Sequence, residues 1–465
     1  MKFLTLLVLG LSLFAKDPYF FEKPYLQLGD RPKQLPQEGL DLMWIGYDKD
    51  VDWTVEYKTD QAWIKATPKM LRRVDVTLTA AHRVYSAPLA RLKPGKPFTY
   101  RISIAGKPIF EASSTARKPA NAASHFVVFG DCSADTAGQR AVAFQVAKEK
   151  PDYIFITGDI VYSRGRVSEY QTKFWPVYNA DQADPQVGAP LLRSTLFTGV
   201  IGNHDSQPVI DFDVNPDGLA FYNYWSLPLN GPLLSPGSKN TPELKGNETI
   251  KQNFLKATSA TFPRMANYSF DYGTVHWTVI DSNTYVDWSS AEFREWVQAD
   301  LKAASRAKWR IVAFHHPPFN SSKAHFKEQR IRLLASIFEA GKVDLVLSGH
   351  VHNYQRTHPL TFEIEPGFTL AKGATEVPGK WTLDKSFDGD KNARPKGVLY
   401  IITGAGGANL YNREQNGDPS SWLDFTNKFV SDTHSFSVID AEEKQLKLRQ
   451  VSAEGKELDR FTLSR

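Results

Sequence analysis

Tyr153-Ile-Phe-Ile-Thr-Gly-Asp159 is the stretch that decides the fold, because an apolar run of strand length ends there in glycine and a carboxylate. A short run of this kind is typical of a strand that is buried on both faces of a sheet. Phe126-Val-Val-Phe-Gly-Asp131 has the same pattern. Open α/β sheets bind ligands at the carboxyl ends of their strands, and a glycine before the acid allows the tight turn. We therefore predict that Asp131 and Asp159 lie at one edge of a buried sheet.

Three further stretches repeat this arrangement with amides and imidazoles. Leu196-Phe-Thr-Gly-Val-Ile-Gly-Asn203 runs into His204, Val312-Ala-Phe-His315 ends in histidine, and Val346-Leu-Ser-Gly-His-Val-His352 ends in two histidines, of which the first is His350. Other Gly-Asp pairs in the chain follow no apolar strand, and we interpret them as turns. The predicted strands are His125–Gly130, Tyr153–Gly158, Leu196–Gly202, Trp309–His315, Val343–Gly349 and Leu399–Gly404.

The part of the chain after Ser124 alternates such strands with amphipathic helices, which indicates an α/β domain over residues 124–465. One predicted helix begins at a capping box of Ser289 and Glu292. A second carries Ile331 to Phe338 and stops at Gly341. We interpret residues 206–265, which are irregular and aromatic, as an elaborated surface loop region beside a site. Residues 435–463 return to strand alternation.

The part before residue 116 has a different periodicity. Apolar and polar residues alternate between about Leu40 and Ile104, with turn residues between short runs, which predicts a small β-sandwich over residues 24–116. The run from Leu92 to Ile102 resembles the turn and strand near the end of a fibronectin type III module. Residues 116–124 are then the linker.

The first 15 residues are typical of a signal peptide, because Lys2 precedes an apolar stretch that ends at Ala15. This predicts a secreted or periplasmic protein. No other run is long and apolar enough to indicate a membrane anchor. Cys132 is the one cysteine, so no internal disulfide forms. The net charge of +5 indicates no nucleic-acid surface but suits a small anionic substrate.

The donor atoms at the five strand ends point to metal chemistry. Oxygen ligands mixed with imidazoles suit a pair of first-row transition metals better than Mg²⁺ or Ca²⁺ alone. A carboxylate can bridge two ions, and ions about 4 Å apart activate a hydroxide and hold both oxygens of an in-line displacement at phosphorus. Five such motifs in order are much stronger evidence than any one of them.

The order of motifs closely resembles the metallophosphoesterase superfamily, and specifically the purple acid phosphatases. The resemblance covers nearly all of the chain after the leader, including Tyr400-Ile-Ile-Thr-Gly-Ala-Gly-Gly407. It implies a four-layer α/β/β/α sandwich after a fibronectin type III-like domain. It also implies that Tyr162, in Gly158-Asp-Ile-Val-Tyr162, is a phenolate ligand to Fe(III). A tyrosine that simply packs is the alternative interpretation of Tyr162.

The resemblance further implies a division of the ligands between Fe(III) and a divalent ion, which is Fe, Zn or Mn. The ferric ion takes Asp131, Asp159, Tyr162 and His352, and the divalent ion takes Asp159, Asn203, His315 and His350.

Two histidines are candidates for catalysis without binding metal. In the family, the histidine that matches His204 contacts the phosphate group and protonates the leaving oxygen. Relatives also place a histidine near the substrate at the position of His325, although a surface histidine at a helix start is an equal alternative. His316 is expected to point away from His315 as a packing residue. Cys132 is expected to be buried, although a thiol can also bind metal.

The resulting prediction is a phosphatase that hydrolyses small phosphomonoesters by attack of a metal-bound hydroxide. One alternative keeps the site and changes the substrate to a phosphodiester or nucleotide, with Tyr222, Tyr224 and Trp225 shaping the pocket. Another is a non-catalytic secreted binding protein with a vestigial metal site, although its intact set of ligand residues argues against it. The sequence leaves the oligomeric state open.

Overall fold

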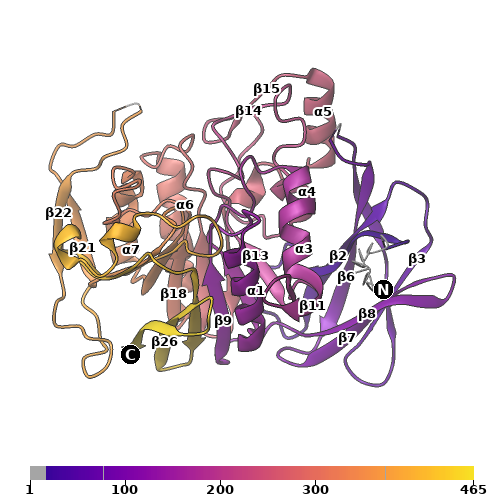
Figure 1. Cartoon of the computed structure of the whole chain (residues 1–465), viewed down its shortest axis with the longest axis horizontal. Helices are drawn as coiled ribbons and strands as arrows, with labels where there is room; N and C mark the ends of the chain where they lie inside the picture. Colours follow the sequence, from indigo (N-terminus) through magenta and orange to yellow (C-terminus); the bar gives the residue numbers. More distant parts are fainter. Residues whose placement is uncertain (1–16, 77, 372) are drawn as a thin grey trace, which may run out of the picture.

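Two β-sheets lie face to face at the centre of the molecule in a computed structural model that describes residues 17–465 except 77 and 372 (Figure 1). Trp277 joins them, because its ring stacks on Phe155 of the other sheet at 4.5 Å and meets Phe126 edge to face at 5.6 Å. The predicted signal peptide lies outside the described residues.

The first central sheet has the order β13-β10-β9-β25-β26-β27. Its parallel strands β9, β10 and β13 end in the motifs that contain Asp131, Asp159 and Asn203. The C-terminal strands extend the sheet from the other side of β9. The bounds are β9 Ser124–Phe129, β10 Tyr153–Ile156, β13 Leu196–Gly199, β25 Ser435–Ala441, β26 Gln445–Ser452 and β27 Glu457–Ser464.

The second central sheet has the order β16-β17-β18-β19-β23-β20-β24. Strands β17, β18, β19 and β23 are parallel, so the histidines after β18 and β19 come to the same edge. The bounds are β16 Tyr268–Tyr272, β17 Val275–Val279, β18 Trp309–Ala313, β19 Leu345–Ser348, β20 Tyr354–Thr357, β23 Leu399–Thr403 and β24 Thr426–Val430.

Helices cover the outer faces of both sheets, which confirms the predicted α/β layers (Figure 1). On the first sheet lie α1 Ala137–Glu149, α2 Val167–Glu169, the π-helical turn η1 Tyr170–Phe174 and α3 Trp175–Tyr178. On the second lie α6 Ala291–Ala303, the short 3₁₀ turns η3 Ala304–Arg306 and η4 Arg330–Leu334, and α7 Ala335–Ala340. Phe293, Val297 and Leu301 of α6 pack on Val312 and Val346 of the second sheet.

The predicted capping box of Ser289 and Glu292 is wrong. The N-cap is Ser290, and the Ser289 hydroxyl donates instead to the carboxylate of Asp287 at 2.5 Å. In a capping box the Glu292 side chain would accept from the backbone N of Ser289. The Asp287 carboxylate accepts from that N at 3.0 Å instead, and the helix begins one residue later. The second predicted helix is half 3₁₀ and half α, and it ends at Gly341 as expected.

Two four-stranded sheets precede the central pair, in the orders β1-β2-β6-β5 and β4-β3-β7-β8. Their resemblance to a fibronectin type III module stays a prediction. The bounds are β1 Phe20–Gln27, β2 Glu38–Tyr47, β3 Trp53–Lys58, β4 Ile64–Ala66, β5 Lys69–Val74, β6 His82–Leu92, β7 Pro97–Ile104 and β8 Lys107–Thr115.

The region 206–265 contains short elements, and its aromatic residues are core residues. The proposed role of Tyr222, Tyr224 and Trp225 in shaping a substrate pocket is wrong, because each is at most 2% exposed. They pack where the N-terminal sheets meet the catalytic layers, and Tyr224 is hydrogen-bonded to His82 at 2.9 Å. The elements are β14 Val209–Asp211, α4 Phe221–Tyr224, β15 Glu243–Lys245, α5 Glu248–Ala257 and η2 Arg264–Ala266.

The remaining elements are short and peripheral: β11 Asn179–Asp184, β12 Gly188–Pro190, β21 Leu360–Ile364, β22 Gly379–Leu383, η5 Arg413–Gln415 and η6 Pro419–Ser421. Within the part of the chain that the structure describes, no helix has the length and apolar character needed to span a membrane.

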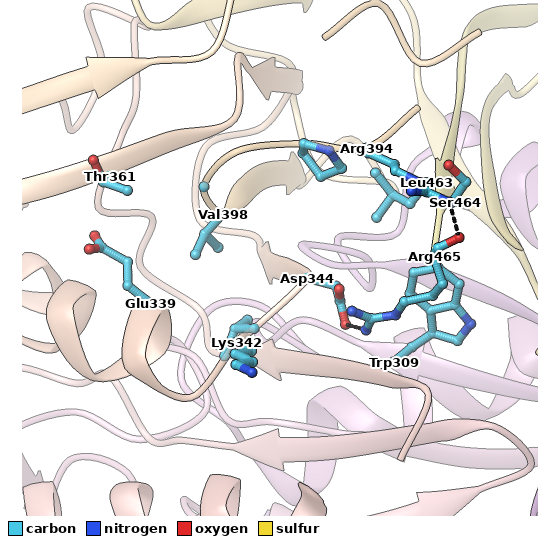
Figure 2. A pocket seen from close by; sticks show the side chains of 13 residues that line it. Trp309, Glu339, Lys342, Asp344, Thr361, Arg394, Val398, Leu463, Ser464 and Arg465 are labelled. Atoms are coloured by element: carbon cyan, nitrogen blue, oxygen red, sulfur yellow. Dashed lines mark hydrogen bonds and ion pairs between the residues drawn. The ribbon is translucent and has the colours of Figure 1, made fainter. Parts of the chain in front are cut away.

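A hollow of about 470 Å³ opens at the amino ends of β18 and β19, at the end of the strands away from the histidines (Figure 2). Trp309, Lys342 and Arg394 line it, and Asp344 forms an ion pair with Arg465 at 2.6 Å. No histidine lines this hollow. It is therefore not part of the site predicted from the strand ends.

Candidate metal centre

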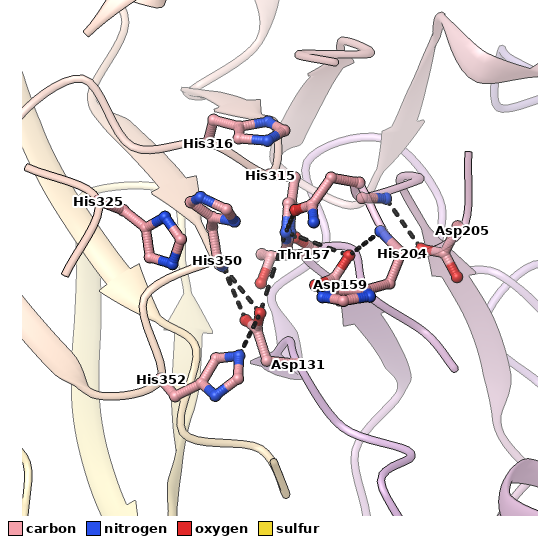
Figure 3. A network of polar contacts seen from close by, with 12 residues as sticks. Asp131, Thr157, Asp159, His204, Asp205, His315, His316, His325, His350 and His352 are labelled. Carbon is pink, nitrogen blue, oxygen red and sulfur yellow. Dashed lines mark hydrogen bonds and ion pairs between the residues drawn. The ribbon is translucent and has the colours of Figure 1, made fainter. Parts of the chain in front are cut away.

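The polar residues that follow five strands meet at one edge of the two sheets (Figure 3). Asp131, Asp159 and Asn203 come from the first sheet, where they follow β9, β10 and β13. His315, His350 and His352 come from the second sheet, after β18 and β19. Residues up to 221 positions apart in the sequence thus form one cluster, which is what parallel strand ends in facing sheets bring about.

His315 lies at the centre of one half of the cluster. Its Nε2 is 3.3 Å from Oδ1 of Asp159 and 3.1 Å from Oδ1 of Asn203. Its Nδ1 donates to the backbone oxygen of Thr157 at 2.9 Å. This outer hydrogen bond fixes the ring so that Nε2 faces the two oxygens, an arrangement common to histidines that bind metals. His350 adds a third ligand atom within 4.8 Å of those of Asp159 and His315.

His352 lies in the other half, together with Tyr162 and Asp131. Its Nδ1 donates to the backbone oxygen of Asn409 at 2.6 Å, so its Nε2 faces inward. That nitrogen is 3.0 Å from the Tyr162 hydroxyl and 3.5 Å from Oδ1 of Asp131. The Tyr162 hydroxyl in turn donates to Oδ1 of Asp131 at 3.1 Å. The possible metal-ligand atoms of a phenol, a carboxylate and an imidazole therefore lie close together.

Several of these residues have an uncommon backbone conformation. Asp131, Asp159 and His350 have φ values of 57°, 48° and 68°, in the left-handed region that costs a non-glycine residue free energy. Outliers of this kind cluster at functional sites, where the surrounding structure maintains them. Gly158 also has a positive φ of 94°, and a Cβ there would meet Nδ1 of His315 at 2.5 Å. Glycine is needed at this position for the close approach of the two sheets.

The site is buried and rich in negative charge. Asp131 and Asp159 are 0% and 1% exposed, and no lysine or arginine among the described residues forms an ion pair with either. Burial raises the pKa of Asp131, and the charge of Asp159 raises it further. Burial disfavours the charge of His315, but the charge and hydrogen bond of Asp159 outweigh it and raise the pKa of His315 to about 10.

This donor set fits metal ions. Two buried carboxylates, an amide oxygen, a phenol and three inward-facing imidazoles are the ligand types that first-row transition metals accept. Buried charges are normally paired or bound to a metal, and among the described residues only histidines form ion pairs with these two carboxylates.

The structure also brings His204 to the site. Its backbone N donates to Oδ1 of Asp159 at 2.9 Å, and its Nδ1 donates to the backbone oxygen of Ser163 at 2.9 Å. Its Nε2 lies 3.8 Å from Oδ2 of Asp159, and 31% of the side chain is exposed. The ring therefore lines the opening with one nitrogen directed inward.

His325 lies on the other side, next to His350, with ring centres 4.1 Å apart (Figure 3). It is not at a helix start, since the next helical turn begins at Arg330. Glu328 joins the two histidines: it accepts from Nδ1 of His325 at 2.8 Å and from Nε2 of His350 at 3.0 Å. Nε2 of His325 and Nδ1 of His350 make no hydrogen bond to any residue that the structure describes.

His316 packs against the site and does not point away from it. Its ring is 4.4 Å from the ring of His350, and its Nδ1 is hydrogen-bonded to the hydroxyl of Ser282 at 2.8 Å. The strand ends at Ala313, so side-chain alternation does not extend to His316. Cys132 is fully buried, as expected, and burial raises the pKa of its thiol to about 12.

Three residues near the site were not among the predicted ones. Glu328 and Tyr411 lie in loops without a periodic pattern, so no local signal marks them. Asp205 ends the Gly202-Asn-His-Asp205 motif, and its carboxylate accepts from the backbone N of Gly202 at 2.8 Å and of Ile160 at 3.1 Å. It thereby joins the two loops that carry Asn203 and Asp159. Asp205 could have been predicted from the sequence, because it is an acidic residue directly after the predicted ligand Asn203 and His204.

Comparison with known proteins also indicates a phosphoesterase. The sequence profile of the calcineurin-like phosphoesterase family matches residues 124–354, about half of the chain. Purple acid phosphatase 21 of Arabidopsis thaliana is 25% identical over 427 residues, which cover 86% of this chain and 81% of that protein.

Solved structures share the fold. A purple acid phosphatase from yellow lupin (Lupinus luteus) seeds superposes with a TM-score of 0.63 at 18% identity, over 95% of this chain and 74% of that one. The structure of PhoD superposes with a TM-score of 0.54 at 14% identity, over 97% of this chain and 90% of that one.

Proposed function

Because the chain belongs to the calcineurin-like phosphoesterases and is of the purple acid phosphatase type, we propose that it hydrolyses phosphomonoesters at a pair of metal ions. The observation that carries this proposal is the division of the donor atoms into two groups around Asp159. Tyr162, Asp131 and His352 form one group, and Asn203, His315 and His350 form the other.

The two groups suit different ions. The group with the phenol would hold Fe(III), which favours an anionic oxygen donor, and the group with the amide and two imidazoles would hold a divalent Fe, Zn or Mn ion. Asp159 would contribute to both, since its Oδ1 lies 3.3 Å from His315 and, after burial, its charge together with that of Asp131 raises the pKa of Tyr162. Two such ions supply an ionised water as nucleophile and neutralise charge on the phosphoryl group.

Residues of the chain would then orient the substrate and move the proton. His204 and His325 lie on opposite sides of the opening, each with Nδ1 engaged and Nε2 free. When the ring is protonated, this nitrogen is suited to donate to a phosphoryl oxygen or to protonate the leaving oxygen. The Glu328 carboxylate would keep the proton of neutral His325 on Nδ1. His325 would therefore act as an acid from Nε2 only when both ring nitrogens are protonated.

The proposal includes export. The leader at residues 1–15 would direct the chain to the periplasm or outside the cell, and cleavage would leave a fibronectin type III-like domain at residues 24–116 before the catalytic domain at 124–465.

Paired assays test the substrate class. The purified protein should hydrolyse a nitrophenyl phosphate monoester much faster than the corresponding bis-ester at the same concentration. Faster hydrolysis of the bis-ester would replace the monoesterase proposal with a phosphodiesterase, and hydrolysis of neither would overturn both.

A visible spectrum tests the ferric site. Protein produced with iron should be pink to violet, because a phenolate bound to Fe(III) absorbs by charge transfer, and Tyr162→Phe should remove this band at equal iron content. A colourless wild type with two bound ions other than iron would contradict the ferric assignment. Persistent colour in Tyr162→Phe would show that another residue supplies the phenolate.

A further inference from the structure

Tyr411 lies face to face on a predicted metal ligand. Its ring is parallel to that of His352, with a centroid distance of 4.0 Å and an interplanar angle of 10°. The backbone N of Tyr411 donates to the backbone oxygen of His352 at 3.1 Å. Asn409, two residues earlier, accepts the proton from Nδ1 of His352 at 2.6 Å. The loop 409–411 therefore contacts this imidazole twice, through the hydrogen bond at Nδ1 and through the ring stacked on its face.

Two tyrosines contact His352, and their hydroxyls differ in environment. The Tyr162 ring meets His352 edge-on at 5.8 Å, and its hydroxyl is engaged by Asp131 and His352. The Tyr411 hydroxyl makes no hydrogen bond within the part of the chain that the structure describes, although the side chain is half-buried. Its hydroxyl is therefore a hydrogen-bond donor without an acceptor among the described residues.

Tyr411 also faces the candidate acid. Its ring centre is 5.7 Å from that of His325, so the side chain is close to both a predicted ligand histidine and a histidine of the opening. A hydroxyl that donates to no group of the protein is available to a bound ligand with acceptor oxygens.

Building on the proposed function, we propose that Tyr411 is a catalytic residue whose hydroxyl donates a hydrogen bond to a phosphoryl oxygen of the substrate. A phosphomonoester has three non-bridging oxygens, so if each of two ions binds one, a free donor beside the site could bind the third. Hydrogen bonds to charged acceptors are stronger than those between neutral groups. The parallel stack on His352 would fix the phenol in place for this contact.

The test is the Tyr411→Phe variant, which keeps the stacked ring and removes the hydroxyl. We expect the dissociation constant for inorganic phosphate, measured by calorimetry on metal-loaded protein, to rise about 10- to 100-fold, the scale of one hydrogen bond to a charged group. The kcat/KM for a nitrophenyl monoester should fall by a similar factor. Metal content and thermal midpoint should match the wild type. Tyr19→Phe, an exposed tyrosine of the N-terminal region, is the control and should change none of these.

Unchanged phosphate affinity and kcat/KM in Tyr411→Phe, beside an active wild type, would overturn this role and leave the proposed function intact. Loss of bound metal in the variant would also overturn it, because Tyr411 would then act only through His352. A wild type that neither binds phosphate nor hydrolyses the monoester would instead overturn the proposed function.

Discussion

His204 is the single residue whose replacement best separates catalysis from metal binding. Its ring contacts Ser163 and faces Asp159, but no ligand position depends on it. His204→Ala should lower kcat by about 10²- to 10⁴-fold, the usual contribution of a general acid or base. Elemental analysis should find the metal content unchanged. His358→Ala, at a half-buried histidine between β20 and β21, is the control. Metal loss in His204→Ala would identify His204 as a ligand and contradict its assigned role.

His276 makes a pH-dependent contribution to stability away from the site. It is fully buried between Asp271 at 2.6 Å and Asp300 at 3.0 Å. Burial disfavours its charge, but the hydrogen bonds to both carboxylates outweigh this and raise the pKa of His276. The pKa values of Asp271 and Asp300 are lowered, since the interaction with His276 outweighs their burial.

The directions of these pKa shifts determine how the stabilisation by His276 changes with pH. A raised histidine pKa stabilises the fold fully below the ordinary value of about 6.5, and the stabilisation is lost as pH rises through the folded-state pKa. The lowered pKa values of the carboxylates mean that their contribution is lost as pH falls through those values. His276→Gln should therefore lower the denaturation midpoint more at about pH 5.5 than at about pH 9. An equal or larger effect at the higher pH would show that His276 is neutral in the fold.

The turn after β10 is the structural element on which the site depends most. Gly158→Ala places a methyl group against His315, whereas Gly417→Ala meets no atom within 4 Å at a similarly positive φ of 71°. Both variants carry the backbone cost of a left-handed alanine, roughly 1 kcal/mol. Gly158→Ala should in addition reduce metal content and activity more than tenfold, while Gly417→Ala keeps both. Equal metal content in the two variants would contradict the requirement for close packing at this turn.

The sequence predicted those strands and helices that are marked by a pattern of neighbouring residues. The six apolar strands end in polar turns within a few residues of the expected positions, because buried strands have a distinctive composition. The capping box of Ser289 and Glu292 failed, because Asp287 competes for the Ser289 hydroxyl. The ligand residues could be proposed because each directly follows a strand. Glu328 and Tyr411 could not, because their places depend on how loops from different elements meet.

At the scale of the whole molecule, the N-terminal sheets and the catalytic layers are joined by buried contacts that no local pattern predicts. Arg117 of the linker forms an ion pair with Glu38 at 2.8 Å, with both side chains 1% exposed. The same guanidinium donates to the backbone oxygens of Lys33 and Asp271, on either side of the junction. The aromatic residues Tyr222 and Tyr224 also pack at this junction. An aromatic stretch of sequence suits a substrate pocket and a buried junction equally well, so the sequence suggested a pocket that these residues do not line.

The most direct test of the two-ion phosphatase is a metal titration of activity. Protein stripped by a chelator and dialysed should not hydrolyse nitrophenyl phosphate. As iron and a divalent ion are returned, the rate should rise and reach its plateau at two ions per chain, because both groups of donor atoms around Asp159 must be filled. Full activity in the stripped protein, or a plateau at one ion per chain, would contradict the two-ion site.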